Sequence, residues 1–327
     1  MRAVTIHQTG GPEVMRVEDV AVPQPGEGQA LVRLEAAGVN FIDIYHRGGQ
    51  YRVTLPFVLG QEGAGIVEAV GPGVTEAARG DRVAFSNVAG TYAQFVVAPS
   101  WRLVPVPAAL TSTDAAAAML QGMTAHYLSH TTFPISPGDT ALVHAAAGGV
   151  GQLLVQMIKR RGGRVIGTVS SAAKAAVARA AGADEVVNYT QTDFVPAVRA
   201  LTDGRGVSVV YDSVGRDTFE RSLDCVGLRG MVVLCGQASG SVSPVDPQVL
   251  NAKGGLFLTR PSLHQYTHTR EELLQRASDV LGWIAEGTLR LRIDRTFPLA
   301  GAAEAHRYLE SRQATGKLLL VPGFLAT

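Results

Sequence analysis

The sequence has few cysteines, almost no net charge and no long apolar run, and each shortage excludes a class of protein. Only Cys225 and Cys235 are present, too few for a disulfide framework or a four-cysteine zinc site. The 29 basic and 28 acidic residues nearly cancel, so bulk charge favours neither a nucleic acid nor an anionic membrane as partner. No run of about 18 apolar residues could span a bilayer, and the N-terminus lacks a signal-peptide pattern. We therefore expect a cytoplasmic protein whose ligands are small molecules.

Two kinds of patterning divide the chain, whose 327 residues exceed what one typical core supports. The first third alternates turns rich in glycine and proline with short β-rich runs, which are Gln29–Leu34, Gly65–Val70, Asp81–Phe85 and Tyr92–Val97. From about Thr140 the pattern becomes strand, helix, strand, helix, which is typical of a parallel sheet covered on both faces. Its predicted strands are Ala141–Val143, Arg164–Ile166, Glu185–Val187, Val207–Tyr211, Met231–Cys235 and Leu256–Leu258. Six such strands complete a doubly wound sheet.

Helix signals fall between and after these strands. The periodic apolar residues after Gly149 predict a helix that ends at Gly162, and further helices are expected over Ser171–Ala181 and Asp217–Cys225. A later helix is expected to open with a capping box at Thr269 and to run to about Gly287. Finally, Lys317–Pro322 is expected to add a strand to the first domain.

The segment Thr140–Gly151 has the pattern of a dinucleotide site, namely a strand, a glycine-rich turn and an amphipathic helix. Gly148 and Gly149 let the backbone approach a pyrophosphate, and Gly151 lets the helix pack closely on the strand. The helix N-terminus offers amide groups and partial positive charge to the phosphates. A glycine-rich turn without a ligand is the plainer interpretation, but a position between a strand and a helix is the context that the motif requires.

No Asp or Glu occurs between Gln152 and Ala183. An enzyme that uses NAD places an acid on the adenosine ribose about 20 residues after the last glycine of the motif. Ser170, Ser171 and Lys174 stand there instead, and two hydroxyls and an ammonium suit a 2′-phosphate. Lysines are common on exposed helix faces, so the missing acid carries more weight than Lys174 does. The sequence therefore predicts NADPH rather than NADH.

Further cofactor contacts are predicted at the carboxyl ends of the later strands, where doubly wound sheets bind their ligands. Tyr189 follows the third strand and either stacks on the adenine or is an ordinary surface tyrosine. Ser213 follows the fourth strand, and the turn that contains Gly236, Gln237 and Ser239 follows the fifth.

The segment Gly138–Lys159 closely resembles the signature of the quinone oxidoreductase and zeta-crystallin family, a branch of the medium-chain dehydrogenase/reductase superfamily. Other matching segments are Asn40–Asp43, Pro56–Gly65, Tyr211–Gly215 and Thr259–Leu263, so the likeness covers nearly the whole chain. The resemblance implies an α/β fold in which a Rossmann doubly wound parallel sheet is joined to a GroES-like, mostly β substrate domain.

This resemblance also implies how the chain is divided and assembled. We expect the first part of the GroES-like domain in residues 1–123, the Rossmann NADPH-binding domain in residues 124–264 and a return to the substrate domain in residues 265–327. A homodimer is implied as well, joined through the last strand of the Rossmann sheet.

Two zinc-ligand positions of the zinc-dependent members are changed in this sequence. Their ligand cysteine is replaced by Asn40, and the histidine of their Gly-His-Glu motif is replaced by Gln61. A catalytic zinc needs three ligands drawn from thiolate, imidazole and carboxylate, so two neutral amides should abolish the site. Asp43 and Glu62 are the residues of the zinc-site motif that this sequence retains. Residues 81–101 contain no cysteine, so a structural zinc site is not expected either. We therefore expect no metal.

Without a metal to polarise a carbonyl, suitable substrates are quinones and other conjugated carbonyl compounds, which accept hydride readily. Asn40, Tyr45 and Tyr51 match positions that line the family's active site, and we expect them to hydrogen-bond the acceptor and stabilise its developing oxyanion. Tyr51 has a second interpretation, because tyrosine often closes the edge of a β domain. The residues predicted to bind the cofactor are Asn40, Phe41, Ile42, Thr124, Ala147, Gly148, Gly149, Val150, Gly151, Ser170, Ser171, Lys174, Tyr189, Ser213, Gly236, Gln237, Ser239 and Lys317.

The predicted function is NADPH-dependent, zinc-free reduction of quinones by hydride transfer. The nearest alternative is an NADPH-dependent reductase of alkenal or enone double bonds, which differs in the atom that receives the hydride. A different alternative is a non-enzymatic protein that binds NADPH or RNA, although a near-zero net charge gives no sign of a basic RNA-binding surface.

Overall fold

The computed structural model describes residues 1–323, and internal contacts divide the chain into two units. Unit 1 comprises Met1–Met123 and Thr267–Thr327, and unit 2 comprises Thr124–Tyr266. The boundary falls inside helix α2 (Ser112–Tyr127), which the sequence patterning did not predict. Its residues 115–119 are all fully buried and apolar, so the helix has no polar stripe from which a 3.6-residue period could be detected.

Unit 2 is built on a parallel sheet with the order β11-β10-β9-β12-β13-β14. Its strands are β9 (Thr140–Val143), β10 (Arg164–Val169), β11 (Glu185–Asn188), β12 (Val207–Asp212), β13 (Val226–Leu234) and β14 (Phe257–Thr259). This is the doubly wound order, in which the direction of winding reverses between β9 and β12. The predicted fold class is confirmed, although β13 begins at Val226 rather than at Met231.

The longer helices of unit 2 bury apolar residues against this sheet, and they are α3 (Gly149–Arg160), α4 (Ala172–Ala180), α5 (Phe194–Leu201) and α6 (Phe219–Cys225). The short α7 (Gln248–Ala252) has no fully buried residue. Two further turns are η3 (Leu128–Thr132), a π-helical continuation of α2, and the 3-10 turn η4 (Leu263–Tyr266). The α5 helix, which was not predicted, begins after Asp193, whose carboxylate accepts a hydrogen bond from the amide of Val195 at 2.9 Å.

Unit 1 contains two sheets. The larger has the order β15-β16-β3-β5-β6-β8, with β7 also paired to β3, and the smaller has the order β2-β1-β4. The strands are β1 (Arg2–Ile6), β2 (Arg16–Asp19), β3 (Gln29–Val39), β4 (Phe57–Val58), β5 (Glu62–Val70), β6 (Arg82–Ser86), β7 (Phe95–Pro99), β8 (Val104–Pro105), β15 (Ile293–Pro298) and β16 (Lys317–Val321). The strand predicted over Tyr92–Val97 begins later, because the backbone of Tyr92 bonds to Val4 and Leu59 and only Phe95 onwards pairs with β3.

Three helices belong to unit 1 alone: α1 (Phe41–Arg47), α8 (Arg270–Ala285) and α9 (Ala302–Glu310). Short 3-10 turns lie at Pro12–Val14, Ser100–Arg102 and Leu299–Gly301. At the start of α8, Thr269 Oγ1 accepts from the amide of Glu272 as predicted, but the Glu272 carboxylate accepts from His268 rather than from Thr269. Across residues 1–323, no helix has the length and apolar character needed to cross a membrane.

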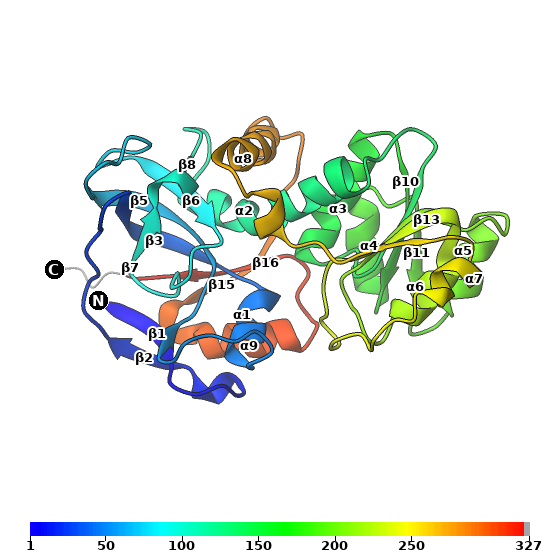
Figure 1. Ribbon diagram of the computed structural model, residues 1–327, viewed down its shortest axis with the longest axis horizontal. Helices are drawn as coiled ribbons and strands as arrows, with labels where there is room; N and C mark the ends of the chain where they lie inside the picture. Colours follow the sequence, from blue (N-terminus) through cyan, green and yellow to red (C-terminus); the bar gives the residue numbers. More distant parts are fainter. Residues whose placement is uncertain (324–327) are drawn as a thin grey trace. The chain divides into compact units, whose positions relative to one another are not determined.

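Strand β16 joins the larger sheet that the N-terminal strands build. β16 pairs antiparallel with β3, with Leu319 opposite Gly38 and Leu318 opposite Val39. Figure 1 shows this pairing as a red strand beside a blue one, which means that the two ends of the chain build one sheet. The predicted strand at Lys317 is therefore confirmed, and it carries the Lys317 side chain into unit 1.

Candidate active site

The glycine-rich turn of unit 2 joins β9 to α3 at the reversal point of the sheet. Ala145 adopts a left-handed conformation, with a φ of 50°, and its carbonyl accepts from the amide of Gly148 at 2.8 Å. A Cβ at Gly151 would collide with the carbonyl of Ala145 and lie 2.9 Å from Ala146 Cα, so only glycine permits this close packing. The first turn of α3 has no acidic residue. The helix N-terminus therefore presents amides and partial positive charge without a competing anion, which fits a pyrophosphate.

The residues predicted to bind a 2′-phosphate follow β10, the strand next to β9. Ser171 caps α4, because its hydroxyl oxygen accepts a 3.3 Å hydrogen bond from the amide of Lys174. The three side chains Ser170, Ser171 and Lys174 are half-buried and lie at the C-terminal end of β10. The chain has no carboxylate between the end of β10 and Asp184. This arrangement fits a phosphate rather than a bare ribose diol.

The other predicted cofactor residues of unit 2 lie at the same end of the sheet. Tyr189 follows β11 and is exposed, while Ser213 and Gly236 follow β12 and β13 and pack so closely that a Cβ at Gly236 would lie 2.6 Å from the Ser213 carbonyl oxygen. Ser239 is already engaged within the chain, since its hydroxyl donates to the Val214 carbonyl at 2.8 Å and accepts from the Asp217 amide at 3.0 Å. Its role toward a cofactor stays a prediction, as do those of Thr124, Ala147 and Val150.

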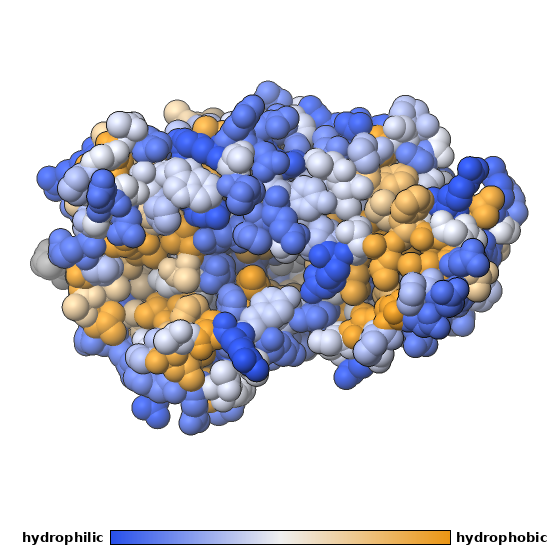
Figure 2. Space-filling view, in the orientation of Figure 1, coloured by the Kyte–Doolittle hydropathy of each residue, from blue (hydrophilic) through white to orange (hydrophobic). Residues whose placement is uncertain are grey.

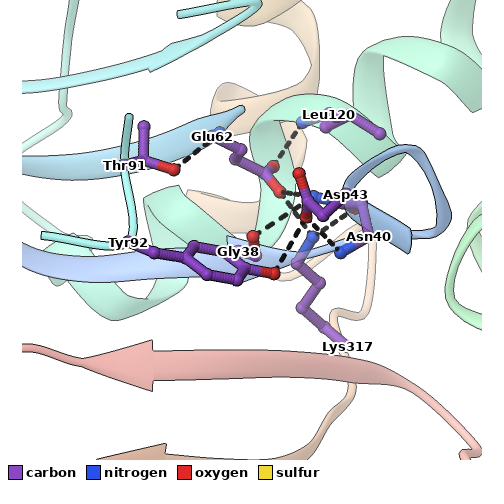
Figure 3. A network of polar contacts seen from close by, with 8 residues as sticks. All are labelled: Gly38, Asn40, Asp43, Glu62, Thr91, Tyr92, Leu120 and Lys317. Atoms are coloured by element: carbon purple, nitrogen blue, oxygen red, sulfur yellow. Dashed lines mark hydrogen bonds and ion pairs between the residues drawn. The ribbon is translucent and has the colours of Figure 1, made fainter. Parts of the chain in front are cut away.

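A buried polar cluster lies in unit 1 at the positions where zinc-dependent relatives hold metal ligands (Figure 3). Lys317 and Glu62 are both fully buried and form an ion pair. The Lys317 ammonium also donates to Asn40 Oδ1 at 2.7 Å, and Asn40 Nδ2 donates to Glu62 Oε2 at 2.9 Å. The second oxygen of Glu62 accepts from the backbone amide of Leu120. Glu62 therefore has a structural role in this cluster, because three hydrogen-bond donors surround its carboxylate.

Space for this cluster depends on Gly38. A Cβ there would collide with the Glu62 carboxylate and would lie 2.7 Å from Lys317 Nζ. Asn40 Nδ2 also lies 3.4 Å from the Gly38 carbonyl oxygen. An amide, an ammonium and one carboxylate are not a zinc donor set. Within residues 1–323, no group of three or more His, Cys, Asp or Glu residues is arranged to hold a metal.

Asp43 stands beside the cluster, on the first turn of α1. Its Oδ2 accepts from the backbone amide of Asn40 at 2.9 Å and from the Tyr92 hydroxyl at 3.0 Å. Complete burial raises the pKa of Asp43 to about 7, against the opposing effects of these two hydrogen bonds and of the Lys317 charge. Sequence reasoning missed Tyr92, which is distant in sequence and was assigned to a strand.

The two predicted catalytic tyrosines contact each other. Tyr45 on α1 and Tyr51 in the following loop form an edge-to-face pair with ring centroids 5.4 Å apart. His46 and Phe57 extend this aromatic group, since the His46 ring lies 5.9 Å from Tyr51 and 5.8 Å from Phe57. Phe41 lies on the same side, 6.3 Å from Tyr45. The structure thus brings Tyr45 and Tyr51 together, while the Asn40 side chain belongs to the polar cluster.

The fold and these two sites define a medium-chain dehydrogenase/reductase, in which a Rossmann unit is combined with a GroES-like unit. Family models agree: residues 26–108 match the alcohol dehydrogenase GroES-like domain, and residues 181–320 match a model described as zinc-binding dehydrogenase. The second description names the wider group, whereas Asn40 and Gln61 depart from its zinc ligands.

Comparison with similar proteins identifies the family of this chain within the superfamily. A quinone oxidoreductase from Pseudomonas aeruginosa is 46% identical over 96% of this chain and 97% of its own length. The 2-haloacrylate reductase of a Burkholderia species is 43% identical, with 98% of each chain covered. The solved structure of the Escherichia coli quinone oxidoreductase complexed with NADPH is 43% identical, covers 98% of this chain and 100% of its own, and superposes with a TM-score of 0.97. The chain belongs to the zinc-independent quinone oxidoreductase family.

Proposed function

We propose that the protein is an NADPH-dependent reductase that transfers hydride to quinones without a zinc ion. The observation that carries the proposal is the buried Lys317–Glu62 ion pair with its hydrogen bonds to Asn40. A fixed ammonium occupies the region where a zinc-dependent relative needs ligands, and the donors around it are the wrong ones for zinc. A substrate must therefore accept hydride without Lewis-acid help, as quinones do.

NADPH fits unit 2 through two features of the chain. The N-terminus of α3, with Gly148, Gly149 and Gly151, suits the pyrophosphate, and Ser170, Ser171 and Lys174 suit the 2′-phosphate. Bound NADPH supplies the hydride. The NADPH complex of the similar E. coli enzyme supports this choice of coenzyme.

The tyrosine hydroxyls and the polar cluster around Asn40 are proposed to have different roles in binding the acceptor. The Tyr45 and Tyr51 hydroxyls are proposed to donate to the acceptor oxygen as negative charge develops on it. Asn40 differs from them, since its Nδ2 already donates to Glu62 and its Oδ1 accepts from Lys317. Its amide can orient an acceptor only by sharing these bonds, so we assign it chiefly to holding the Lys317 ammonium in place.

The test is oxidation of NADPH and of NADH with a small quinone. Lys174→Ala should raise KM for NADPH by about tenfold or more while leaving KM for NADH unchanged, because a charge-assisted phosphate contact is lost. Arg179→Ala is the matched control, since it removes a cation from the exposed face of the same helix. Equal use of both coenzymes by the wild type would contradict the phosphate site. NADPH binding without turnover of any acceptor would instead favour a non-enzymatic role.

One relative favours a second candidate function. The 2-haloacrylate reductase is named for a conjugated alkene substrate, and it is 43% identical to this chain. Reduction of an activated double bond uses the same coenzyme but delivers hydride to carbon. A panel of enones, alkenals and 2-haloacrylates, assayed beside the quinones under the same conditions, separates the two functions by kcat/KM.

We also propose a cytoplasmic homodimer joined along the edge strand β14. Phe257 in β14 is 58% exposed and Leu228 in the adjacent β13 is 75% exposed, which is unusual for large apolar side chains. Figure 2 shows further apolar surface in the area where Figure 1 labels β13. A parallel-sheet edge with apolar neighbours needs cover, and a second copy of the same edge would provide it.

A further inference from the structure

Four buried side chains of unit 1 form a chain of hydrogen bonds that begins and ends on the same helix. Arg47, the last residue of α1, has its Nη1 3.0 Å from His306 Nδ1. His306 Nε2 lies 3.0 Å from the Tyr92 hydroxyl, which lies 3.0 Å from Asp43 Oδ2 on the first turn of α1. All four residues are at most 3% exposed. The chain therefore closes a loop from one end of α1 to the other through α9 and the segment before β7.

The direction of every hydrogen bond in this chain follows from Arg47. A guanidinium only donates, so His306 Nδ1 must accept and the imidazole proton must sit on Nε2. His306 then donates to the Tyr92 oxygen, which leaves the Tyr92 hydrogen for Asp43. Burial and the Arg47 charge lower the pKa of His306 to about 3, so the imidazole is neutral under ordinary conditions.

Arg47 itself is held by three acceptors besides His306. Its Nη2 donates to Glu310 Oε1 at 2.6 Å, its Nη1 donates to Glu310 Oε2 at 3.2 Å, and its Nε donates to the Gly10 carbonyl at 3.1 Å. The guanidinium plane is thereby oriented before it reaches His306. A bidentate arginine–carboxylate pair is the most directional ion pair available to a protein.

At the other end, Asp43 uses only one of its oxygens. Oδ2 accepts from both Tyr92 and the amide of Asn40, whereas Oδ1 has no hydrogen-bond partner in the part of the chain that the structure describes. The charged groups nearest to it are Lys317 and Glu62, which pair with each other. A proton taken up by Asp43 belongs on Oδ1, where it disturbs neither accepted bond.

The helix that this chain holds is too short to be stable alone. α1 has 7 residues, while isolated helices below about 12 residues are marginal in water. Yet α1 carries Tyr45, and Asn40 stands at its N-cap. The position of both side chains therefore depends on what fixes the two ends of α1.

We infer that His306 and Tyr92 are positioning residues for the reduction, which clamp α1 between Arg47 and Asp43. They thereby fix Tyr45, which is proposed to contact the acceptor, and Asn40, which holds the Lys317 ammonium. The inference rests on the proposed function. Neither residue touches the acceptor or the coenzyme in this role. They act through the hydrogen bond that Asp43 Oδ2 accepts from the amide of Asn40.

The experiment compares Tyr92→Phe with Tyr308→Phe in the full-length protein. Tyr308 is a matched control, because it also donates to a carboxylate, Asp294 at 3.1 Å, and lies on α9 beside His306. Tyr92→Phe should lower kcat for quinone reduction by on the order of tenfold or more, since small misplacements of catalytic groups are costly, with KM for NADPH unchanged. Tyr308→Phe should leave kcat unchanged. His306→Gln, which keeps a donor and an acceptor, should retain more activity than His306→Ala.

Two further measurements separate positioning from general stability. Loss of the Tyr92 donor raises the pKa of Asp43, so carboxyl titration followed by ¹³C NMR should show a higher Asp43 pKa in Tyr92→Phe and an unchanged one in Tyr308→Phe. The ¹⁵N spectrum of the wild type should show His306 with its proton on Nε2. Unchanged kcat and an unchanged pKa of Asp43 in a folded Tyr92→Phe variant, or a wild-type His306 proton on Nδ1, overturns the inference. A wild type that turns over neither quinones nor enones overturns the proposed function instead, and the positioning role with it.

Discussion

Lys317 donates a 2.7 Å hydrogen bond from its ammonium to Asn40 Oδ1, although the two residues are 277 positions apart in sequence. The same ammonium neutralises Glu62, which is fully buried. Lys317→Met should therefore lower the free energy of unfolding by about 3 to 5 kcal/mol, because it leaves a buried carboxylate without its partner. Urea unfolding measures the effect.

A surface lysine provides the control for this prediction. Lys159 pairs with Asp184 at 2.8 Å, but both side chains are about one third exposed, so Lys159→Met should cost no more than about 1 kcal/mol. Combining Lys317→Met with Glu62→Gln should recover much of the loss, since the buried charge is gone. Equal losses of unfolding free energy in Lys317→Met and Lys159→Met would contradict the prediction that the buried ion pair stabilises the protein more than the surface pair does.

Gly151→Ala tests the close packing of the glycine-rich turn that is proposed to bind the pyrophosphate. Its Cβ would meet backbone atoms of Ala145 and Ala146, which cannot swing away as a side chain can, so we expect a loss of about 1 to 3 kcal/mol and weaker NADPH binding. Gly282 in α8 has open space around the same position. Gly282→Ala should instead stabilise the protein by about 0.5 to 1 kcal/mol. Thermal unfolding and NADPH fluorescence titration of both variants provide the readouts.

The buried imidazole of His306 predicts a loss of stability in acid. Its pKa is lowered from 6.5 to about 3 in the folded protein, so between these values only the unfolded chain binds the proton. The stabilising contribution is complete above pH 6.5 and falls by up to about 1.4 kcal/mol per pH unit as the pH drops toward 3. His306→Gln should flatten this acid limb when unfolding free energies are measured across the range. A parallel slope in the variant would contradict the prediction.

The raised pKa of Asp43 predicts the opposite dependence of stability on pH, over a partly overlapping pH range. Its pKa is raised from 3.8 to about 7, so the folded protein binds the proton more tightly than the unfolded chain does. The stabilising contribution is complete below pH 3.8 and is lost as the pH rises through 7. Asp43→Asn, which stays neutral, should therefore become more stable relative to the wild type as the pH is raised from 4 to 8. No such trend in chemical denaturation would count against a buried, protonated Asp43.

The proposed dimer edge yields a fifth prediction. Replacing Leu228 and Phe257 together by glutamate should convert a dimer into a monomer, because charge is placed on both apolar side chains of the β13–β14 edge. Val70→Glu is the control, since Val70 is an apolar residue of unit 1 that is 41% exposed. Sedimentation velocity at several protein concentrations distinguishes the species, and a wild type that sediments as a monomer contradicts the proposed assembly.

The strands of unit 2 were predictable because a strand that is buried on both faces is an unbroken apolar run. Val207–Tyr211 and Arg164–Ile166 are clear examples, and both lie within observed strands. β13 was shortened in the prediction because Gly227, Arg229 and Gly230 interrupt its first half. Helix α2 was not predicted because its alanine run is buried throughout and shows no alternation between buried and exposed positions.

The glycine-rich turn between β9 and α3 could be located in the sequence because its residues are contiguous. The polar cluster could not, since Asn40, Glu62 and Lys317 come from three strands or strand ends that only the folded sheet brings together. Its charges did give a signal: Glu62 and Lys317 each adjoin a buried apolar stretch. The Arg47–His306–Tyr92–Asp43 chain gave none, because two of its three hydrogen bonds join residues more than 200 positions apart and leave no local pattern.

The pairing of β16 with β3 has a consequence for protein synthesis. Until the ribosome has added β16, the Ala37–Val39 end of β3 lacks its partner strand and Glu62 lacks its counter-ion, although both were made early. Unit 2 is contiguous and needs nothing from the C-terminal segment to complete its own sheet. Cotranslational folding usually starts with the N-terminal domain, but here the GroES-like unit can complete its larger sheet only after all of unit 2 has been synthesised.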